Sequence, residues 1–308
     1  MTQSYPRADL AGALRIATAQ LSQAGVPSPQ ADAVALAAHL WGVSWGEVRR
    51  RAVLGAPMPD GYAELVQRRA DRVPLQHLTG VAPFRHIELS VGPGVFVPRP
   101  ETETLVQLAL DYLGQDTTAP GRPAVAVDLC TGSAAVALAI VDEVVAYRSH
   151  GVHMTAVELS EHAMAYARQN VARLGAAMHL VHGDAADPLL ADLVALNGAV
   201  DLVTCNPPYI PNGAIPRDPE VREHDPDMAL YGQSADGLAV PARMASRAAA
   251  LLRPGGLLVM EHADSQGESL PTMIDSQGWW SSVQDEPDVT GRPRVTRAIR
   301  SEERFTAR

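Results

Sequence analysis

An Asn-Pro-Pro-Tyr tetrapeptide, residues 206–209, directly follows an apolar run over residues 200–205. Because two consecutive prolines cannot continue the hydrogen bonding of a sheet, the chain must leave the predicted strand in a stiff, extended turn. Such a turn presents the Asn206 amide, the Pro207 carbonyl and the Tyr209 ring at the strand's carboxyl end, where open α/β sheets bind ligands. Two oxygen acceptors beneath an aromatic ring suit a planar NH2 group. For the tetrapeptide alone, a proline-rich surface turn is the alternative interpretation.

A second chemical segment lies upstream, where a strand pattern over residues 125–129 runs into small residues before a helix pattern. Those small residues are Cys130, Thr131, Gly132, Ser133 and Ala134. In a Rossmann-like unit, small residues after the first strand let the backbone approach a cofactor. An ordinary tight turn is the alternative. At the end of the next strand pattern, Glu158 is placed to accept hydrogen bonds from both ribose hydroxyls, or else to complement the helix dipole before Ser160.

Together these segments resemble the methyltransferases that use S-adenosylmethionine to methylate amino groups on planar nitrogens. Residues 96–103, Phe-Val-Pro-Arg-Pro-Glu-Thr-Glu, look like the signature stretch of the HemK family, the glutamine methyltransferases that act on peptide chain release factors. The resemblance runs from about Arg68 to about Arg300, and more loosely through the N-terminal helices. Further stretches that fit the same family are residues 74–80, 225–230, 236–238, 254–256 and 291–294.

The resemblance implies methyl transfer from S-adenosylmethionine to the side-chain amide nitrogen of a glutamine, in the Gly-Gly-Gln loop of release factors. It also implies that Asp184 receives the adenine amino group with Ala185 beside the ring, although a simple turn aspartate is an equal alternative. The implied catalytic residues are Asn206, Pro207, Pro208 and Tyr209. The implied cofactor-binding residues are Asp128, Cys130, Thr131, Gly132, Ser133, Ala134, Glu158, Asp184, Ala185 and Asn206. The family pattern has glycine at the places of Cys130 and Ala134, and we expect binding to survive because both residues are small.

The predicted reaction asks the protein chiefly to orient and desolvate a weak amide nucleophile. We expect Asn206 Oδ1 and the Pro207 carbonyl each to accept one N–H, with Tyr209 packed against the amide plane; no dedicated general base is evident. Three alternatives stay open: a glutamine of a ribosomal protein, an adenine or guanine amino group in DNA or RNA, and a silent adaptor. Arg99, Glu101 and Glu103 form either a lid or binding wall near the cofactor or a salt-bridge cluster between domains.

The amino-acid composition limits the classes of partner that the chain is expected to bind. The chain has 308 residues, a formal net charge of −10, no lysine and 25 arginines, which is typical of a bacterium with a GC-rich genome. The acidic balance favours a protein substrate, so we expect no direct nucleic-acid contact. No apolar run reaches the length of a membrane span, and two cysteines are too few for a disulfide framework. We therefore expect a cytoplasmic monomer that makes no membrane contact. The histidines lack metal-ligand spacing, and we expect no metal.

The elements that position these residues are predicted as three segments. Residues 1–82 form a substrate-binding bundle of helices, with no ionisable cluster inside it. Residues 83–98 form a β-hairpin linker, whose turn lies at Gly92–Gly94 before a strand at residues 95–97. Residues 99–308 form an α/β, Rossmann-like, seven-stranded class I methyltransferase domain with its last strand antiparallel. The polar loop over residues 210–226 is expected to be a substrate-binding flap.

Overall fold

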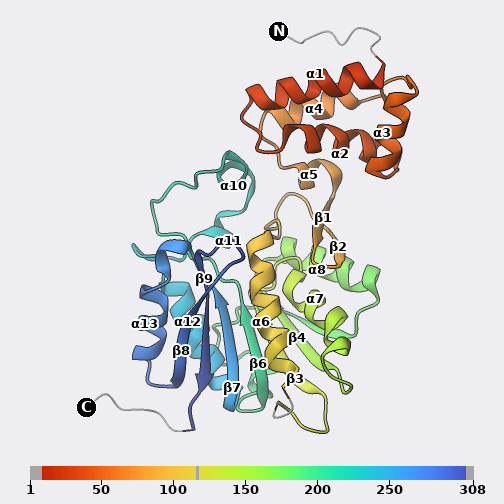
Figure 1. The fold of residues 1–308 in the computed structure, drawn as a ribbon. Coiled ribbons are helices and arrows are strands. Elements are labelled where there is room, and N and C mark those ends of the chain that lie inside the picture. Colours follow the sequence, from red (N-terminus) through yellow and green to blue (C-terminus); the bar gives the residue numbers. More distant parts are fainter. Residues whose placement is uncertain (1–8, 116–117, 303–308) are drawn as a thin grey trace. The chain divides into compact units, whose positions relative to one another are not determined.

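A computed structural model of the chain describes residues 9–115 and 118–302. Its contacts divide the chain into two units. Unit one consists of Met1–Val81 with Pro216–His224, and unit two consists of Ala82–Ile215 with Asp225–Arg308 (Figure 1). The segment Pro216–His224, which lies within the expected flap, thus groups with the N-terminal helices. No helix in the described ranges has both the length and the apolar character to cross a membrane.

Unit one is helical, as predicted. Its helices are α1 (Leu10–Gln23), α2 (Pro29–Trp41), α3 (Trp45–Val53), α4 (Tyr62–Ala70), α5 (Leu75–Thr79) and α10 (Pro219–His224). Its core packs one apolar side of α1 and of α4 around α2, which is buried at every residue from 32 to 38. At the start of α3, Ser44 and Glu47 form only half of a capping box. Ser44 Oγ accepts a hydrogen bond from Glu47 N at 3.2 Å, but the Glu47 carboxylate binds Arg50 and Arg51 instead of reaching back.

The prediction that this bundle holds no ionisable cluster is wrong. Buried Arg69 donates to Asp32 and to Glu220, at 2.8 Å in each case, and Arg72 binds the same Glu220 carboxylate at 2.5 Å. Burial would raise the pKa of Glu220, but the hydrogen bonds from Arg72 and Arg69 outweigh it and lower the pKa to about 2. The partners lie 37 and 151 positions apart in the chain, so no local spacing announces the cluster.

The linker contains a two-stranded sheet, although the predicted strands are partly wrong. Strands β1 (Val81–Phe84) and β2 (Ile87–Ser90) pair across a turn at Arg85, which has a φ of +49°. Residues 95–97 are not a strand. Val95 and Val97 are instead buried individually in the core of unit two, and the prolines on either side of this stretch have no N–H to donate to a ladder.

Unit two contains the predicted seven-stranded sheet, in the order β5-β4-β3-β6-β7-β9-β8. Neighbouring strands from β5 to β7 are parallel, and β9 runs antiparallel to both β7 and β8. The α/β fold class and the antiparallel last strand are therefore confirmed. The strands are β3 (Ala124–Leu129), β4 (Val152–Glu158), β5 (Met178–His182), β6 (Val200–Cys205), β7 (Leu252–Glu261), β8 (Trp280–Pro287) and β9 (Pro293–Arg300).

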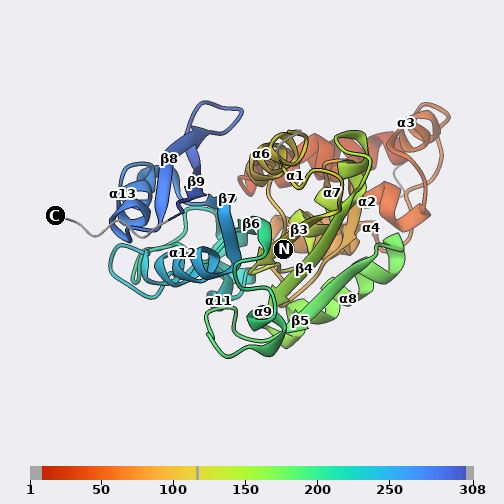
Figure 2. The same cartoon turned by 90° about the horizontal axis from the view of Figure 1, so that it is seen from below.

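Helices cover both faces of this sheet, and each face has its own apolar core. Helices α6 (Glu103–Leu113), α7 (Ala135–Glu143) and α8 (Glu161–Leu174) contribute to one core. Helices α9 (Ala191–Val194), α12 (Ala239–Leu251) and α13 (Ser269–Ser276) contribute to the other (Figure 2). The remaining helical turns of the unit are η1 (Pro100–Thr102), η2 (Val144–Ala146), α11 (Asp227–Leu230) and η3 (Asp264–Gln266).

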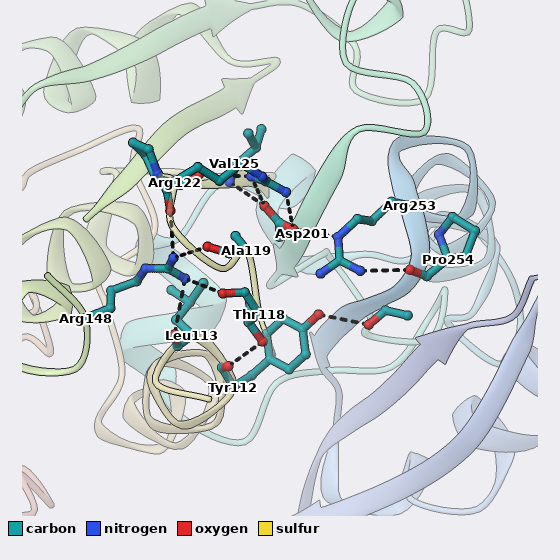
Figure 3. A network of polar contacts seen from close by, with 12 residues as sticks. Tyr112, Leu113, Thr118, Ala119, Arg122, Val125, Arg148, Asp201, Arg253 and Pro254 are labelled. Carbon is teal, nitrogen blue, oxygen red and sulfur yellow. Dashed lines mark hydrogen bonds and ion pairs between the residues drawn. The ribbon is translucent and has the colours of Figure 1, made fainter. Parts of the chain in front are cut away.

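A buried carboxylate ties the amino ends of the central strands together. The Asp201 side chain on β6 is fully buried, accepts from Val125 N of β3, and binds the guanidinium groups of Arg122 and Arg253 (Figure 3). Arg148 donates to carbonyl groups of the same loop, Ala119 and Arg122 among them. This network anchors the sheet at the edge opposite the carboxyl ends of its parallel strands.

Candidate active site

The sequence-predicted residues converge on the carboxyl edge of the sheet. Because β3 and β6 are parallel neighbours with Leu129 opposite Cys205, Cys130 and Asn206 leave the two strands side by side. Glu158 ends β4, the other neighbour of β3, and Glu261 ends β7, the other neighbour of β6. The small-residue turn and the Asn-Pro-Pro-Tyr turn therefore lie next to each other, which neither motif shows by itself.

The turn after β3 has an unusual backbone. Cys130, Gly132 and Ala134 have φ angles of +60°, +59° and +66°, a left-handed conformation that costs L-residues roughly 1–2 kcal/mol each. Glycine, which the resemblance implies at the first and third positions, adopts this conformation without strain, whereas the present chain adopts it with cysteine and alanine. A Cβ added to Gly132 would meet no heavy atom within 4 Å, so open space borders the backbone there.

Asp128, near the end of β3, stabilises this turn through its side chain. Its buried carboxylate accepts hydrogen bonds from Thr131 Oγ1 at 2.5 Å and from Thr204 Oγ1 at 2.7 Å, which joins the turn to β6. Burial raises the pKa of Asp128 to about 6, against the opposing effect of the two threonine hydroxyls. The side chains of Thr131 and Ser133 are themselves buried. The structure thus gives Asp128 and Thr131 a supporting part in the geometry of the turn.

Glu158 links the turn to the next helix. One carboxylate oxygen accepts from Gly132 N at 2.8 Å, and the other accepts from Ser160 N at 2.7 Å at the beginning of α8. Burial raises the pKa of Glu158 above its ordinary value despite these backbone donors. The two roles predicted for Glu158 are therefore compatible. The carboxylate stabilises the start of a helix, and it lies beside Gly132 with lone pairs that can still accept hydrogen bonds.

Asp184 and Ala185 follow β5 at the same edge. Asp184 is exposed, and its Oδ1 accepts from Ala186 N at 2.8 Å, which is the geometry of a turn aspartate. Ala185 is buried in the core of that face. The turn interpretation of Asp184 thus has a contact in the structure, and its adenine role stays a prediction.

The Asn-Pro-Pro-Tyr turn is held from three sides. Asn206 Nδ2 donates to Thr102 Oγ1 at 3.4 Å, Tyr209 Oη donates to Glu261 Oε1 at 3.3 Å, and Gln266 Nε2 donates to the Tyr209 carbonyl at 3.0 Å. A Cβ on Gly237 would lie 2.1 Å from that carbonyl oxygen, so only glycine permits this close approach. Because Nδ2 donates to Thr102, the oxygen of the Asn206 amide can accept a hydrogen bond from an N–H or O–H group of a ligand.

The site also contains three residues for which no role was predicted: Thr102, Glu261 and Gln266. Thr102 lies inside the Pro-Arg-Pro-Glu-Thr-Glu stretch, between the two glutamates that drew attention. A single acid at the end of the apolar run 257–260 is a signal that points to Glu261. No comparable signal marks Gln266, whose contact with Tyr209 spans 57 positions.

The charged residues of the signature stretch point to different partners. Arg99 binds Asp225 at 2.7 Å, with its guanidinium over the Phe96 ring. Glu103 Oε1 accepts from Arg85 N at 3.1 Å in the β1–β2 turn. These contacts all lie within unit two, and the part of these residues in a lid or in an interdomain cluster stays a prediction. The described residues contain no group of three or more potential metal ligands.

Comparison with known proteins places the chain among named relatives. Residues 12–80 match the family described as the PrmC N-terminal domain. The chain is 46% identical over 284 residues to the release factor glutamine methyltransferase of Streptomyces coelicolor, covering 92% of this chain and 95% of the relative. The enzyme of the same name from Mycolicibacterium smegmatis is 44% identical over 291 residues, with coverage of 94% and 96%.

Two further comparisons differ in kind. A 4-amino-L-phenylalanine/4-methylamino-L-phenylalanine methyltransferase from Streptomyces pristinaespiralis is 39% identical over 293 residues, with coverage of 93% and 94%. Among solved structures, a methyltransferase from Pyrococcus furiosus matches 69% of this chain and 88% of its own, at 19% identity and a TM-score of 0.47.

Proposed function

Because the chain belongs to the release factor glutamine methyltransferase family, we propose that it methylates the side-chain amide nitrogen of a glutamine in peptide chain release factors, using S-adenosylmethionine. The observation that carries this proposal is the pairing of Leu129 with Cys205, which sets an Asn206 amide beside a small-residue turn. We further propose that residues 1–82 bind the substrate protein and that the enzyme acts as a cytoplasmic monomer. The net charge of −10 supports a protein partner rather than bare nucleic acid.

The turn after β3 fits the proposed cofactor, because open space borders Gly132 and the backbone is free to approach a ligand. When bound, S-adenosylmethionine supplies an electrophilic methyl group on a sulfonium sulfur. Glu158 would receive the ribose hydroxyls on the lone pairs that Gly132 and Ser160 do not occupy. Asp184 and Ala185 would border the adenine ring. Because Glu158 accepts hydrogen bonds from Gly132 N and Ser160 N, replacing it should also disturb the turn after β3.

Asn206 would fix the acceptor amide. Thr102 accepts from its NH2 group, so its oxygen and the Pro207 carbonyl remain to accept the two N–H groups of the glutamine amide. This arrangement turns the nitrogen toward the methyl group and stabilises the positive charge that develops on it. Transfer would form the N–CH3 bond while the S–CH3 bond of the sulfonium breaks and leaves a neutral thioether, and the nitrogen would then give up one proton to water. Pro208 keeps the turn stiff, and the Tyr209 ring would cover the amide plane.

Methylation of an aromatic amine is a second candidate. The relative from Streptomyces pristinaespiralis carries that name at 39% identity over nearly its whole length. An arylamine NH2 group is also planar, and the same two acceptors suit it. Overall similarity alone therefore leaves the acceptor to be decided by experiment.

The deciding experiment incubates the protein with radiolabelled S-adenosylmethionine and parallel acceptors: release factors, ribosomal proteins, RNA and 4-amino-L-phenylalanine. We expect label in the release factors, and none when the glutamine of their Gly-Gly-Gln loop is replaced by glutamate, which has no NH2 group. Label in the aromatic amine or in RNA, with unlabelled release factors, would overturn the proposal.

A variant tests the assigned site. Asn206→Ala should lower turnover by about 10²–10³-fold, by analogy with the loss of one preorganised polar contact, while calorimetry shows nearly unchanged cofactor affinity. Asn206→Asp keeps an acceptor and should retain part of the activity. Glu158→Gln should weaken cofactor binding more than it slows turnover. Exposed Gln169 on α8 serves as the control, since Gln169→Ala removes a side-chain amide outside the site. Wild-type turnover by Asn206→Ala would place the site elsewhere.

A further inference from the structure

Glu261 is a buried acid at the active-site edge to which the proposed reaction assigns no part. It ends β7, the parallel neighbour of the strand that leads into Asn206, and it is only 1% exposed. One of its oxygens accepts from Tyr209 Oη, and the other, Oε2, has no hydrogen-bond partner although it is fully covered. Burying a carboxylate with an unsatisfied oxygen is costly. Such a group at a site edge indicates function.

Glu261 also joins the two motifs that carry the site. Thr102 Oγ1 accepts from Asn206 Nδ2, and the same hydroxyl lowers the pKa of Glu261, so one side chain acts on both the buried acid and the amide. Tyr209 is held at its hydroxyl by Glu261 and at its carbonyl by Gln266. The acid thus fixes both polar ends of the Asn-Pro-Pro-Tyr turn, through Thr102 on one side and directly on the other.

The charges around Glu261 come from each element packed against it. Arg294 on β9 attracts its negative charge, whereas Glu101 of η1 repels it, and the phenol of Tyr209 donates to it. His262, the next residue, is turned to Asp285 on β8 at 2.8 Å. Burial is the largest effect and raises the pKa of Glu261 to about 7, while Thr102 and Arg294 oppose the rise. Burial likewise raises the pKa of Tyr209 far above its ordinary value, so its hydroxyl remains a donor.

We propose that Glu261 is a positioning residue whose ionised carboxylate fixes Tyr209 and Thr102 and sets a negative charge behind the acceptor amide. This inference rests on the proposed function. As the nitrogen is methylated it gains positive charge, and a buried carboxylate in a medium of low polarity stabilises that charge without reorganisation. The protonated acid loses that stabilisation. Turnover should therefore depend on the ionisation of Glu261.

The first test is the pH profile of methylation of a release factor. In the wild type, kcat should rise through about pH 7 and level off above it. Glu261→Gln keeps the shape and the acceptor but loses the charge, so kcat should fall roughly tenfold to a hundredfold and that rise should disappear. The KM for S-adenosylmethionine should stay the same. Glu268→Gln makes the same change at an exposed glutamate and should keep the wild-type profile. Tyr209→Phe combined with Glu261→Gln should lose less than the product of the single losses.

A second measurement uses the protein without cofactor. Carbon-13 labelling of glutamate carboxyls should show one resonance titrating near pH 7 that is missing in Glu261→Gln. Because the folded pKa lies above the unfolded one, ionised Glu261 opposes folding above pH 7. The variant should accordingly melt at or above the wild-type temperature at pH 8. A glutamine variant that methylates at the wild-type rate, keeps the rise near pH 7, or simply unfolds at lower temperature would overturn the inference. Failure of the wild type to label any release factor would instead overturn the proposed function.

Discussion

Neutralising Asp201 should destabilise unit two without touching its active site. The carboxylate is fully buried and receives four hydrogen bonds: from Arg122 Nη1 at 2.8 Å and Nη2 at 2.9 Å, from Arg253 Nε at 2.6 Å, and from Val125 N at 2.8 Å. In Asp201→Asn, the new NH2 group faces donors on at least one side. Hydrogen bonds to charged groups contribute about 1.5–3 kcal/mol each, and breaking a buried pair costs about 3–5 kcal/mol.

The expected loss is smaller than that upper range, because the arginine side chains are 44% and 29% exposed and water can solvate them again. We expect a decrease in the free energy of unfolding of about 2–4 kcal/mol. At about 2–4 °C per kcal/mol for a unit of this size, the melting temperature should fall by roughly 4–16 °C. Calorimetry and urea unfolding measure both quantities. Well below the melting temperature, turnover should stay near the wild-type value.

The pH dependence of the same variant gives a sharper test. Burial would raise the pKa of Asp201, but the hydrogen bonds from Arg122, Val125 N and Arg253 outweigh burial and lower it. The stabilisation is therefore complete above the ordinary pKa of an aspartate and is lost as the pH falls through the lower, folded value. Asp201→Asn should flatten that acid-side loss. Asp192, half exposed and paired with His179, is the control, and Asp192→Asn should change stability by less than about 0.5 kcal/mol. Equal effects of the two substitutions would refute this reasoning.

Two further changes test local features. Cys130→Gly should unfold at the same urea concentration as the wild type or a higher one, because glycine adopts the φ of +60° without strain, whereas Cys130→Val should lose about 1–2 kcal/mol; a destabilised glycine variant would contradict the strain. Arg69→Met should cost unit one about 3–5 kcal/mol by leaving Asp32 unpaired in a buried site, measured by hydrogen exchange of the helices. Glu220 keeps its ion pair with Arg72 in this variant, so it should retain part of its acid-sensitive stability. An unchanged exchange rate would argue against the cluster.

Much of the architecture was predictable because it depends on local sequence patterns, namely hydrophobic periodicity, cap residues and turn residues. The alternation of strands and helices after residue 124 predicted the α/β sheet, and local cap residues, Ser160 and Gly175, bound α8. The antiparallel last strand was also predicted. The linker went wrong where two glycines around Pro93 suggested a hairpin turn. The structure places that turn at Arg85, where a non-glycine residue takes a positive φ that no composition rule favours.

Residue contacts within the candidate site were less predictable, because they join segments far apart in the chain. Thr102 contacts Asn206 across 104 positions, and Tyr209 contacts Glu261 across 52. A local motif shows which chemical groups the chain contains. Only the order of the strands in the sheet determines which of these groups come into contact. The same holds for Asp32 and Arg69 in unit one, whose spacing of 37 residues carries no helical or strand periodicity.

The three contacts of the Asn-Pro-Pro-Tyr turn explain why a stiff tetrapeptide is useful at this position. Two prolines restrict the backbone before any partner binds, so Thr102, Glu261 and Gln266 need to order only the side chains and one carbonyl. Because this order exists before a substrate arrives, little of the binding energy is spent on arranging the acceptors. The signature stretch that contains Thr102 then has a physical reason to occur with the tetrapeptide: its hydroxyl holds the Asn206 amide in one orientation. Without that hydroxyl, the Asn206 amide can rotate by half a turn. Its NH2 group, rather than its oxygen, would then face the nitrogen that is to be methylated.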